Sequence, residues 1–236
     1  MSETHQESLH SIGARHGTDK SHYGTLLPFY EKHLSQYRDQ EINVLEIGVF
    51  FGASLRMWRE YLPKAQVYGM DHFTGKQGNG QVFQGARDFW DKVQSKEAEG
   101  VDRIHLIECD QSDRKGLEKV KDDFLKSGIK FQFILDDASH LMKDQQLSLG
   151  ILWPLLKTNG TFFMEDWGSS LDYRYIDVKK DYSNTTLTMM HLFNEKKLFK
   201  SEYMKSEEEE LLTATAKHPI VLLDSSNSTT ACINKS

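Results

Sequence analysis

The stretch Asn43-Val44-Leu45-Glu46-Ile47-Gly48-Val49-Phe50-Phe51-Gly52-Ala53-Ser54 joins a short apolar run to two glycines that lie four residues apart. An apolar run of this length is typical of a buried strand. Glycine permits a sharp turn and a close approach of the backbone to a ligand. The stretch contains neither Gly-x-Gly-x-x-Gly nor the Gly-Lys-Ser/Thr of a P-loop, so it favours a nucleoside cradle over a polyphosphate site.

Four more apolar runs follow, and amphipathic segments separate them. The runs span 66–71, 103–110, 131–137 and 160–166, and the expected helices span 54–62, 88–96, 113–126 and 143–156. This alternation predicts an α/β fold with a mostly parallel sheet and helices on both faces, which binds ligands outside the carboxyl ends of its strands. A further helix is expected at 186–200, and the segments 220–224 and 229–233 around a Ser/Asn turn predict a C-terminal antiparallel hairpin.

Composition excludes several classes of function. The chain has 236 residues and a formal charge of −6, with 29 Lys and Arg against 35 Asp and Glu, which argues against a nucleic-acid partner. No apolar run reaches the ~18–20 residues of a membrane helix. The N-terminus is polar and acidic, so we expect no membrane partner and a cytoplasmic location. Cys109 and Cys232 stand apart from any zinc or disulfide pattern.

Polar residues close three successive strands of the expected sheet. Glu46 lies beside the glycine turn, Asp71 ends the second strand, and Asp110-Gln111 end the third. An acid at the second position can accept both hydroxyls of a ribose, and an acceptor with an amide suits an adenine edge. Each feature alone is commonly a structural turn or a helix cap. Their joint occurrence, in order, indicates a nucleoside cofactor.

A second group of acids closes the next two strands. Asp137 ends the fourth strand and Glu165-Asp166 end the fifth, so the three carboxylates converge if these strands are neighbours. Hard oxygen ligands suit Mg²⁺, or Mn²⁺ or Ca²⁺, better than a soft metal. Alternatively, Asp137 caps the following turn and Asp166 pairs with a Lys or Arg.

The motifs taken together resemble a known group, the class I S-adenosylmethionine-dependent methyltransferases. Within them, the sequence is most similar to the metal-dependent sugar O-methyltransferases of macrolide and tetracenomycin biosynthesis. The resemblance covers most of the chain and rests on Gly17-Thr18-Asp19-Lys20, Leu45-Glu46-Ile47-Gly48, Ser54-Leu55-Arg56-Met57-Trp58, Asp110-Gln111-Ser112-Asp113, Asp136-Asp137-Ala138-Ser139-His140 and Glu165-Asp166. It implies a Rossmann-like seven-stranded sheet.

The resemblance also implies the cofactor and the roles of the site residues. S-adenosylmethionine is expected to contact the glycine turn, the acids and amide at the strand ends, and two residues of the N-terminal segment. These are Glu46, Gly48, Gly52, Ser54, Asp71, Asp110, Gln111, Asp136, Lys20 and Tyr23. The resemblance assigns a bound Mg²⁺ to Asp137, Glu165 and Asp166, and it makes His140 the general base.

Two segments are candidates for covering the site. Residues 1–40 are expected to form an N-terminal helical segment that acts as a lid over a cofactor-binding domain at 41–236, and the Gly-rich stretch 73–87 is a second candidate lid. Trp167, Tyr173, Tyr175, Met189 and Met190 are candidates for the walls of the acceptor pocket, although the two methionines fit a core helix equally well. A homo-oligomer is expected from the resemblance.

The sequence leaves two chemical classes of methyl acceptor open. A sugar or other vicinal diol suits a chelating metal, whereas a small carboxylic acid is already ionised near neutral pH and needs no base. The first acceptor predicts a hydroxyl O-methyltransferase of secondary metabolism, and the second predicts a carboxyl O-methyltransferase. A nucleoside-binding module without catalysis and an iron-dependent hydroxylase are the alternatives from other classes, although the hydroxylase's usual ligand set of two His and one carboxylate is not apparent.

Overall fold

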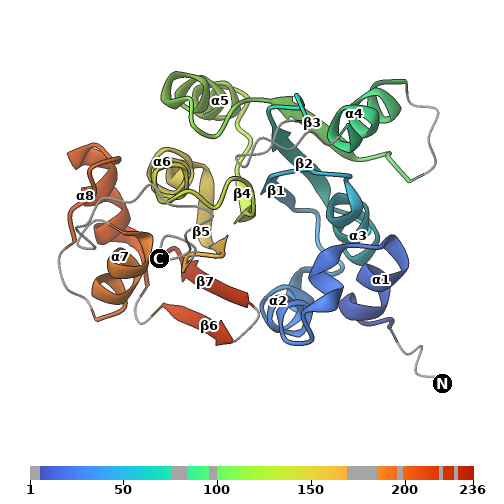
Figure 1. Cartoon of the computed structure of the whole chain (residues 1–236), viewed down its shortest axis with the longest axis horizontal. Helices are drawn as coiled ribbons and strands as arrows, with labels where there is room; N and C mark the ends of the chain where they lie inside the picture. Colours follow the sequence, from blue (N-terminus) through green and yellow to red (C-terminus); the bar gives the residue numbers. More distant parts are fainter. Residues whose placement is uncertain are drawn as a thin grey trace.

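The chain is described by a computed structural model that covers residues 6–75, 84–95, 100–168, 185–195, 199–217, 220–225 and 228–236. The described residues form a seven-stranded sheet of order β3-β2-β1-β4-β5-β7-β6 (Figure 1). The strands are β1 Asn43–Ile47, β2 Gln66–Asp71, β3 Ile104–Glu108, β4 Phe131–Asp136, β5 Leu156–Glu165, β6 Val221–Ser225 and β7 Ser228–Asn234. The first five pair in parallel, and β7 pairs antiparallel with both β5 and β6. The expected sheet and hairpin are therefore confirmed.

Helices cover both faces of this sheet (Figure 1). Helices α1 Leu9–His16, α2 Leu26–Leu34, α3 Ala53–Tyr61 and α4 Gly85–Ser95 pack on one face, and α5 Arg114–Lys126, α6 Met142–Leu152, α7 Thr186–Asn194 and α8 Ser206–Thr215 pack on the other. Side chains along β1 alternate between the two cores: Val44 joins the first, and Leu45 and Ile47 join the second. All six residues of β4 are buried, as expected for a central strand covered on both faces.

The N-terminal segment shares the first core. Its helices α1 and α2 are joined by the short 3₁₀ helix η1, Asp19–His22, and η2, Ser35–Tyr37, follows α2. The ring of Tyr30 in α2 meets the rings of Trp58 and Phe163 edge-on, with centroids 5.6 and 4.9 Å apart. This packing fixes η1 against the sheet, which matters for the site below.

Several predicted boundaries are wrong, for local reasons. The helix expected at 143–156 ends at Leu152 and is followed by the 3₁₀ turn Trp153–Leu155, because Pro154 cannot continue an α-helix. Strand β5 then begins at Leu156 rather than at 160. Helix α4 begins at Gly85, inside the stretch expected to be irregular, and packs against the glycine turn. No helix in the described part of the chain is long and apolar enough to cross a membrane.

Candidate functional site

The carboxyl ends of the parallel strands lie at one edge of the sheet, and the chain turns sharply there. Asp137 directly follows β4, and its backbone N–H donates to the carbonyl of Ile47 at the end of β1 (3.0 Å). Four non-glycine residues with positive φ follow β1, β2, β4 and β5, namely Phe50, Phe73, His140 and Asp166. Residues other than glycine rarely adopt this conformation, and such positions cluster at functional sites.

A buried lysine joins the N-terminal segment to this edge. Lys20 lies in η1, and its side chain is only 2% exposed. Its Nζ donates to Oδ2 of Asp137 and to Oε1 of Glu165, the latter at 2.7 Å. Oε1 of Glu46 lies 3.8 Å from the same Nζ. One ammonium group therefore faces carboxylates from the ends of β1, β4 and β5.

Burial and charge both act on these groups. Burial lowers the pKa of Lys20, but the carboxylates of Asp137, Glu165 and Glu46 outweigh it, so this pKa lies well above its ordinary value. Burial raises the pKa of Glu165, and Lys20 opposes that rise. Tyr30 donates to Oε1 of Glu165 at 2.6 Å, and burial raises the pKa of its phenol. A charged ammonium thus compensates carboxylates that are shielded from water.

A second cluster forms around His140. Its Nε2 lies 3.8 Å from Oδ1 of Asp137, and its Nδ1 lies 3.4 Å from Oδ2 of Asp166. One ligand atom from each of these three residues lies within 4.8 Å of the others. Two carboxylates and an imidazole are a donor set that suits Mg²⁺ or Mn²⁺. The chemistry of these residues therefore fits a divalent cation.

The loop that carries His140 is held by hydrogen bonds on either side of it. The backbone N–H of Ser139 donates to Oε1 of Gln111 (3.2 Å), and its hydroxyl donates to Oδ2 of Asp144 (2.8 Å). Gln111 in turn donates through Nε2 to both carboxylate oxygens of Asp136, at 2.8 and 2.7 Å. Burial raises the pKa of Asp136 to about 7. The expected cofactor residues Gln111 and Asp136 thus bond to each other and support the His140 loop.

The glycine turn after β1 is built for a close approach. Gly48 has φ 95° and Gly52 has φ 69°, and both values favour glycine. The carboxylate of Asp71 accepts the backbone N–H of Val49 and that of Phe73, each at 2.9 Å. Asp71, which is expected to bind the ribose, therefore also connects the glycine turn to the end of β2.

Glu46 offers an acceptor beside this turn. Its Oε2 accepts from the hydroxyl of Ser54 (2.8 Å) and from the indole N–H of Trp58 (3.1 Å). Its buried Oε1 has no hydrogen-bond partner among the described residues. Buried acceptors are nearly always satisfied, so this oxygen fits a donor from a bound ligand. The residues present therefore fit a nucleoside cofactor with an ammonium or amide group.

Comparison with protein families decides the class. Residues 45–167 match the family model described as a methyltransferase domain, from the middle of β1 to the turn after β5. The chain belongs to this methyltransferase family. The matched region contains all of the strand-end residues discussed above from Glu46 to Asp166.

Curated relatives of this methyltransferase domain are named as O-methyltransferases. The chain is 30% identical over 168 residues to 8-demethyl-8-(2-methoxy-alpha-L-rhamnosyl)-tetracenomycin-C 3'-O-methyltransferase of Streptomyces olivaceus, a match that covers 67% of this chain and 36% of that protein. It is equally similar to mycinamicin VI 2''-O-methyltransferase of Micromonospora griseorubida, with 67% and 35% covered. The matched region thus spans about a third of the length of each relative.

A solved structure supports the fold of the methyltransferase domain. MycE methyltransferase from the mycinamycin biosynthetic pathway, in complex with Mg, SAH and mycinamycin VI, superposes with a TM-score of 0.66 at 22% identity. The alignment covers 99% of this chain and 56% of that one. At 22% identity, this similarity supports the arrangement of helices and strands, that is, the fold alone.

Two predicted cofactor residues, Asp110 and Tyr23, are exposed and belong to neither cluster. Asp110 is exposed, and its Oδ1 accepts from the backbone N–H and the hydroxyl of Ser112 (2.8 and 2.7 Å). Tyr23 is 37% exposed. Partial burial and the nearby carboxylates of Asp19, Asp166 and Asp137 raise the pKa of its phenol. Tyr23 thus stands near the carboxylates, and its predicted contact with the cofactor stays a prediction.

The sequence did not reveal which side chains donate hydrogen bonds to the predicted metal-binding and cofactor-binding carboxylates. The contact of Lys20 with the cofactor stays a prediction, and sequence reasoning did not foresee that its ammonium bonds two of the three expected metal ligands. Tyr30 and Trp58 donate to Glu165 and Glu46 across the first core, and neither was assigned a role. A single Lys, Tyr or Trp in a helix carries no signal of such a distant partner, so only the fold could identify them.

Some residues expected to line the acceptor pocket are buried in the second core, and the others lie outside the described residues. Trp167, Met189 and Met190 are buried in the second core. Tyr173, Tyr175 and most of the 73–87 stretch lie outside the described residues. The acidic run 207–210 forms part of α8, where Glu208 accepts from Arg114 (2.6 Å).

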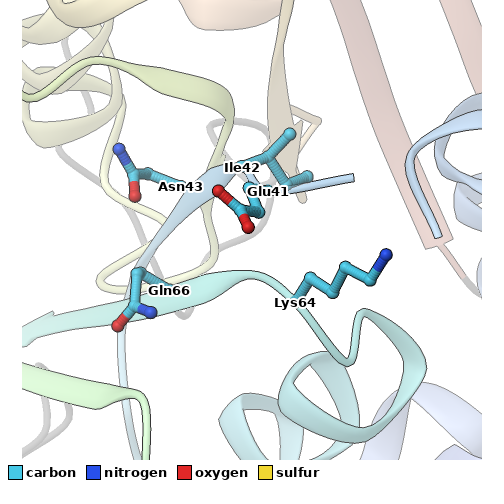
Figure 2. A pocket seen from close by; sticks show the side chains of 5 residues that line it. All are labelled: Glu41, Ile42, Asn43, Lys64 and Gln66. Carbon is cyan, nitrogen blue, oxygen red and sulfur yellow. The ribbon is translucent and has the colours of Figure 1, made fainter. Parts of the chain in front are cut away.

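A surface hollow of about 540 Å³ lies at the opposite edge of the sheet. Its lining residues are Glu41, Ile42, Asn43, Lys64 and Gln66 (Figure 2). Asn43 and Gln66 begin β1 and β2, so the hollow sits at the amino ends of these strands. Parallel sheets bind ligands at the other ends, where the two clusters lie, so the hollow has no part in the candidate site.

Proposed function

We propose that this chain is an S-adenosylmethionine-dependent O-methyltransferase that acts on a hydroxyl of a sugar or other vicinal diol and uses a divalent cation. The proposal rests on one observation: Asp137, His140 and Asp166 gather beside the glycine turn at the carboxyl ends of the strands. The family assignment and the names of the curated relatives support the same reaction.

The cofactor would be held at the turn after β1. Oε1 of Glu46, which accepts no hydrogen bond among the described residues and faces the Lys20 ammonium at 3.8 Å, would accept from its methionine part, and Asp71 would accept from its ribose hydroxyls. Gly48 keeps the backbone free of side-chain atoms where the cofactor approaches. Asp110, Gln111 and Asp136 would border the adenine side, with Gln111 and Asp136 already bonded to each other.

The cation would be held by Asp137 and Asp166, which lie in the cluster with His140, and the resemblance adds Glu165 at the end of β5. When bound, S-adenosylmethionine supplies an electrophilic methyl group, and the divalent cation supplies positive charge that lowers the pKa of a chelated hydroxyl. All three carboxylates belong to the ends of β4 and β5. Asp137 and Glu165 already share one cation, the ammonium of Lys20.

His140 would take the proton of the acceptor hydroxyl. Its imidazole lies between Asp137 and Asp166, at 3.8 and 3.4 Å. Its two ring nitrogens face different carboxylates, so one nitrogen can keep its N–H toward an acid while the other takes the proton. The hydrogen bonds of Ser139 hold the loop, so the imidazole is positioned before the acceptor binds.

A carboxylic acid acceptor is the second candidate, and one observation favours it. His140 lies within the compact group of possible ligand atoms, whereas Glu165 is bonded to Lys20 and Tyr30. An imidazole that binds a cation cannot also take a proton through the same nitrogen. An acceptor that is already ionised removes the need for a base.

The test is an assay for release of S-adenosylhomocysteine with panels of sugar diols and of small carboxylic acids, each with Mg²⁺ and with EDTA. Turnover of diols that EDTA abolishes is the expected result. Turnover of acids that resists EDTA would replace the proposal by carboxyl methylation. Absence of turnover with either panel, while S-adenosylmethionine binds, would favour a cofactor-binding module without catalysis.

A further inference from the structure

Lys20 bonds two of the three carboxylates that the resemblance assigns to a divalent cation. Its Nζ bonds Asp137 and Glu165, and it lies 3.8 Å from Glu46. The side chains of Lys20, Glu46 and Glu165 are 2%, 2% and 7% exposed, so water screens these charges poorly. Asp137 also belongs to the cluster with His140 and Asp166. One carboxylate therefore belongs to both groups.

We propose that Lys20 is an internal cation that competes with the divalent cation and sets how tightly it binds. The inference rests on the proposed function for the presence of a metal, and it adds a role for a residue of the N-terminal segment. A metal that uses Asp137 must share or displace the bond from Lys20. Two cations a few ångströms apart repel each other, and water screens this repulsion poorly beside the buried Lys20 and Glu165.

The packing of the N-terminal segment positions Lys20 for this competition. Lys20 is carried by η1, which is joined to α1 and α2, and both helices pack in the first core. Tyr30 of α2 bonds the same Glu165 oxygen as Lys20. The segment thus supplies the cation that neutralises the strand-end acids when no metal is bound. Lys20 acts here as a positioning residue, because it acts through the carboxylates of Asp137 and Glu165 that it bonds.

The experiment measures Mn²⁺ binding by electron paramagnetic resonance, with neither cofactor nor acceptor present. In Lys20→Met the Kd for Mn²⁺ should fall at least tenfold, because the competing charge is gone. A lysine with only a structural role would leave affinity unchanged or weaken it. Lys235→Met is the matched control: Lys235 donates to the carbonyls of Trp153 and Leu156, and its loss removes the same charge elsewhere. Its Kd should stay within threefold of the wild type.

A second pair of variants keeps the test valid if Lys20→Met does not fold. The double variant Lys20→Met with Glu165→Gln removes one positive and one negative charge together. It is compared with Glu165→Gln alone, and the double variant should bind Mn²⁺ at least tenfold more tightly, because Asp137 is released from Lys20. Equal or weaker binding than in the matched parent would overturn the role of Lys20.

The outcomes separate this inference from the proposed reaction. Tighter Mn²⁺ binding without any methyl transfer would support Lys20 as the competing cation and overturn the reaction. Methyl transfer that needs Mg²⁺, with unchanged affinity in the Lys20 variants, would support the reaction and overturn the role of Lys20. Failure of every variant to bind Mn²⁺ would overturn both.

Discussion

Gly48 lies so close to Asp137 that a β-carbon on Gly48 would sit 2.1 Å from the main-chain carbonyl oxygen of Asp137. The backbone at this point also has φ 95°. The glycine turn after β1 and the first predicted metal ligand after β4 are therefore in direct backbone contact. A change at the expected cofactor cradle must move the acid loop as well.

Replacing Gly48 with alanine should damage both parts of the site. The left-handed backbone costs an alanine roughly 1–2 kcal/mol, and the clash with a main-chain atom adds roughly 1–3 kcal/mol. We expect urea unfolding to show a loss of at least about 2 kcal/mol, and calorimetry to show weaker S-adenosylmethionine binding.

Gly128→Ala is the matched control for this substitution. Gly128 has φ +68° and nothing within 4 Å of an added β-carbon, so its replacement should cost only the backbone penalty of about 1 kcal/mol. Equal stability and cofactor affinity in the two variants would show that the contact with Asp137 has no consequence.

Replacing His140 with alanine should remove the proposed proton acceptor. Turnover of a diol acceptor should fall by ~10²–10⁴, with little change in affinity for S-adenosylmethionine. Single-turnover rates and calorimetric titrations would measure the two quantities. His10→Ala, at an exposed position of α1, is the control and should keep full turnover. A His140 variant that is as fast as this control would remove His140 from the mechanism.

Stability should depend on pH through Glu46. Burial raises the pKa of this carboxyl from 4.5 to about 7 in the folded chain. The unfolded chain loses this proton first as pH rises, so folding becomes less favourable between about pH 4.5 and 7. At 1.36 kcal/mol per pKa unit, the effect of this one group is at most about 3 kcal/mol.

Glu46→Gln should therefore flatten this pH dependence. Urea unfolding at several pH values, without cofactor or metal, would measure the slopes. Glu210→Gln, in an exposed position of α8, should leave the wild-type slope unchanged. If the slopes of the wild type and Glu46→Gln coincide, Glu46 ionises normally in the folded chain.

The two thiols should be unreactive in the folded protein. Burial, followed by the carboxylates of Asp113 and Asp110, raises the pKa of Cys109 to about 11. Burial raises that of Cys232 to about 12. At pH 8 only about a thousandth of Cys109 and about a ten-thousandth of Cys232 is ionised, and the thiolate is the reactive form. Labelling with an aromatic disulfide reagent should be slow in buffer and rapid in urea. Rapid labelling in buffer would contradict the prediction that both thiols stay buried and protonated in the folded protein.

The local sequence determined the strands and the order of the chemistry along the chain. The apolar run that ends at Gly48 could form a buried strand, and the alternation that follows could form a parallel sheet, because periodicity depends only on near neighbours. Parallel strands bring their carboxyl ends to one edge, so the positions of Asp137 and Asp166 at that edge followed as well.

Only the tertiary structure decided which charges meet at that edge. Lys20 lies 117 residues from Asp137 and 145 from Glu165, and nothing in its local pattern marks it as their partner. Pairing of buried charges depends on the packing of α1 and α2 against the sheet, which no short segment encodes by itself. The sequence thus supplied the carboxylates, and long-range packing determined the cation that holds them.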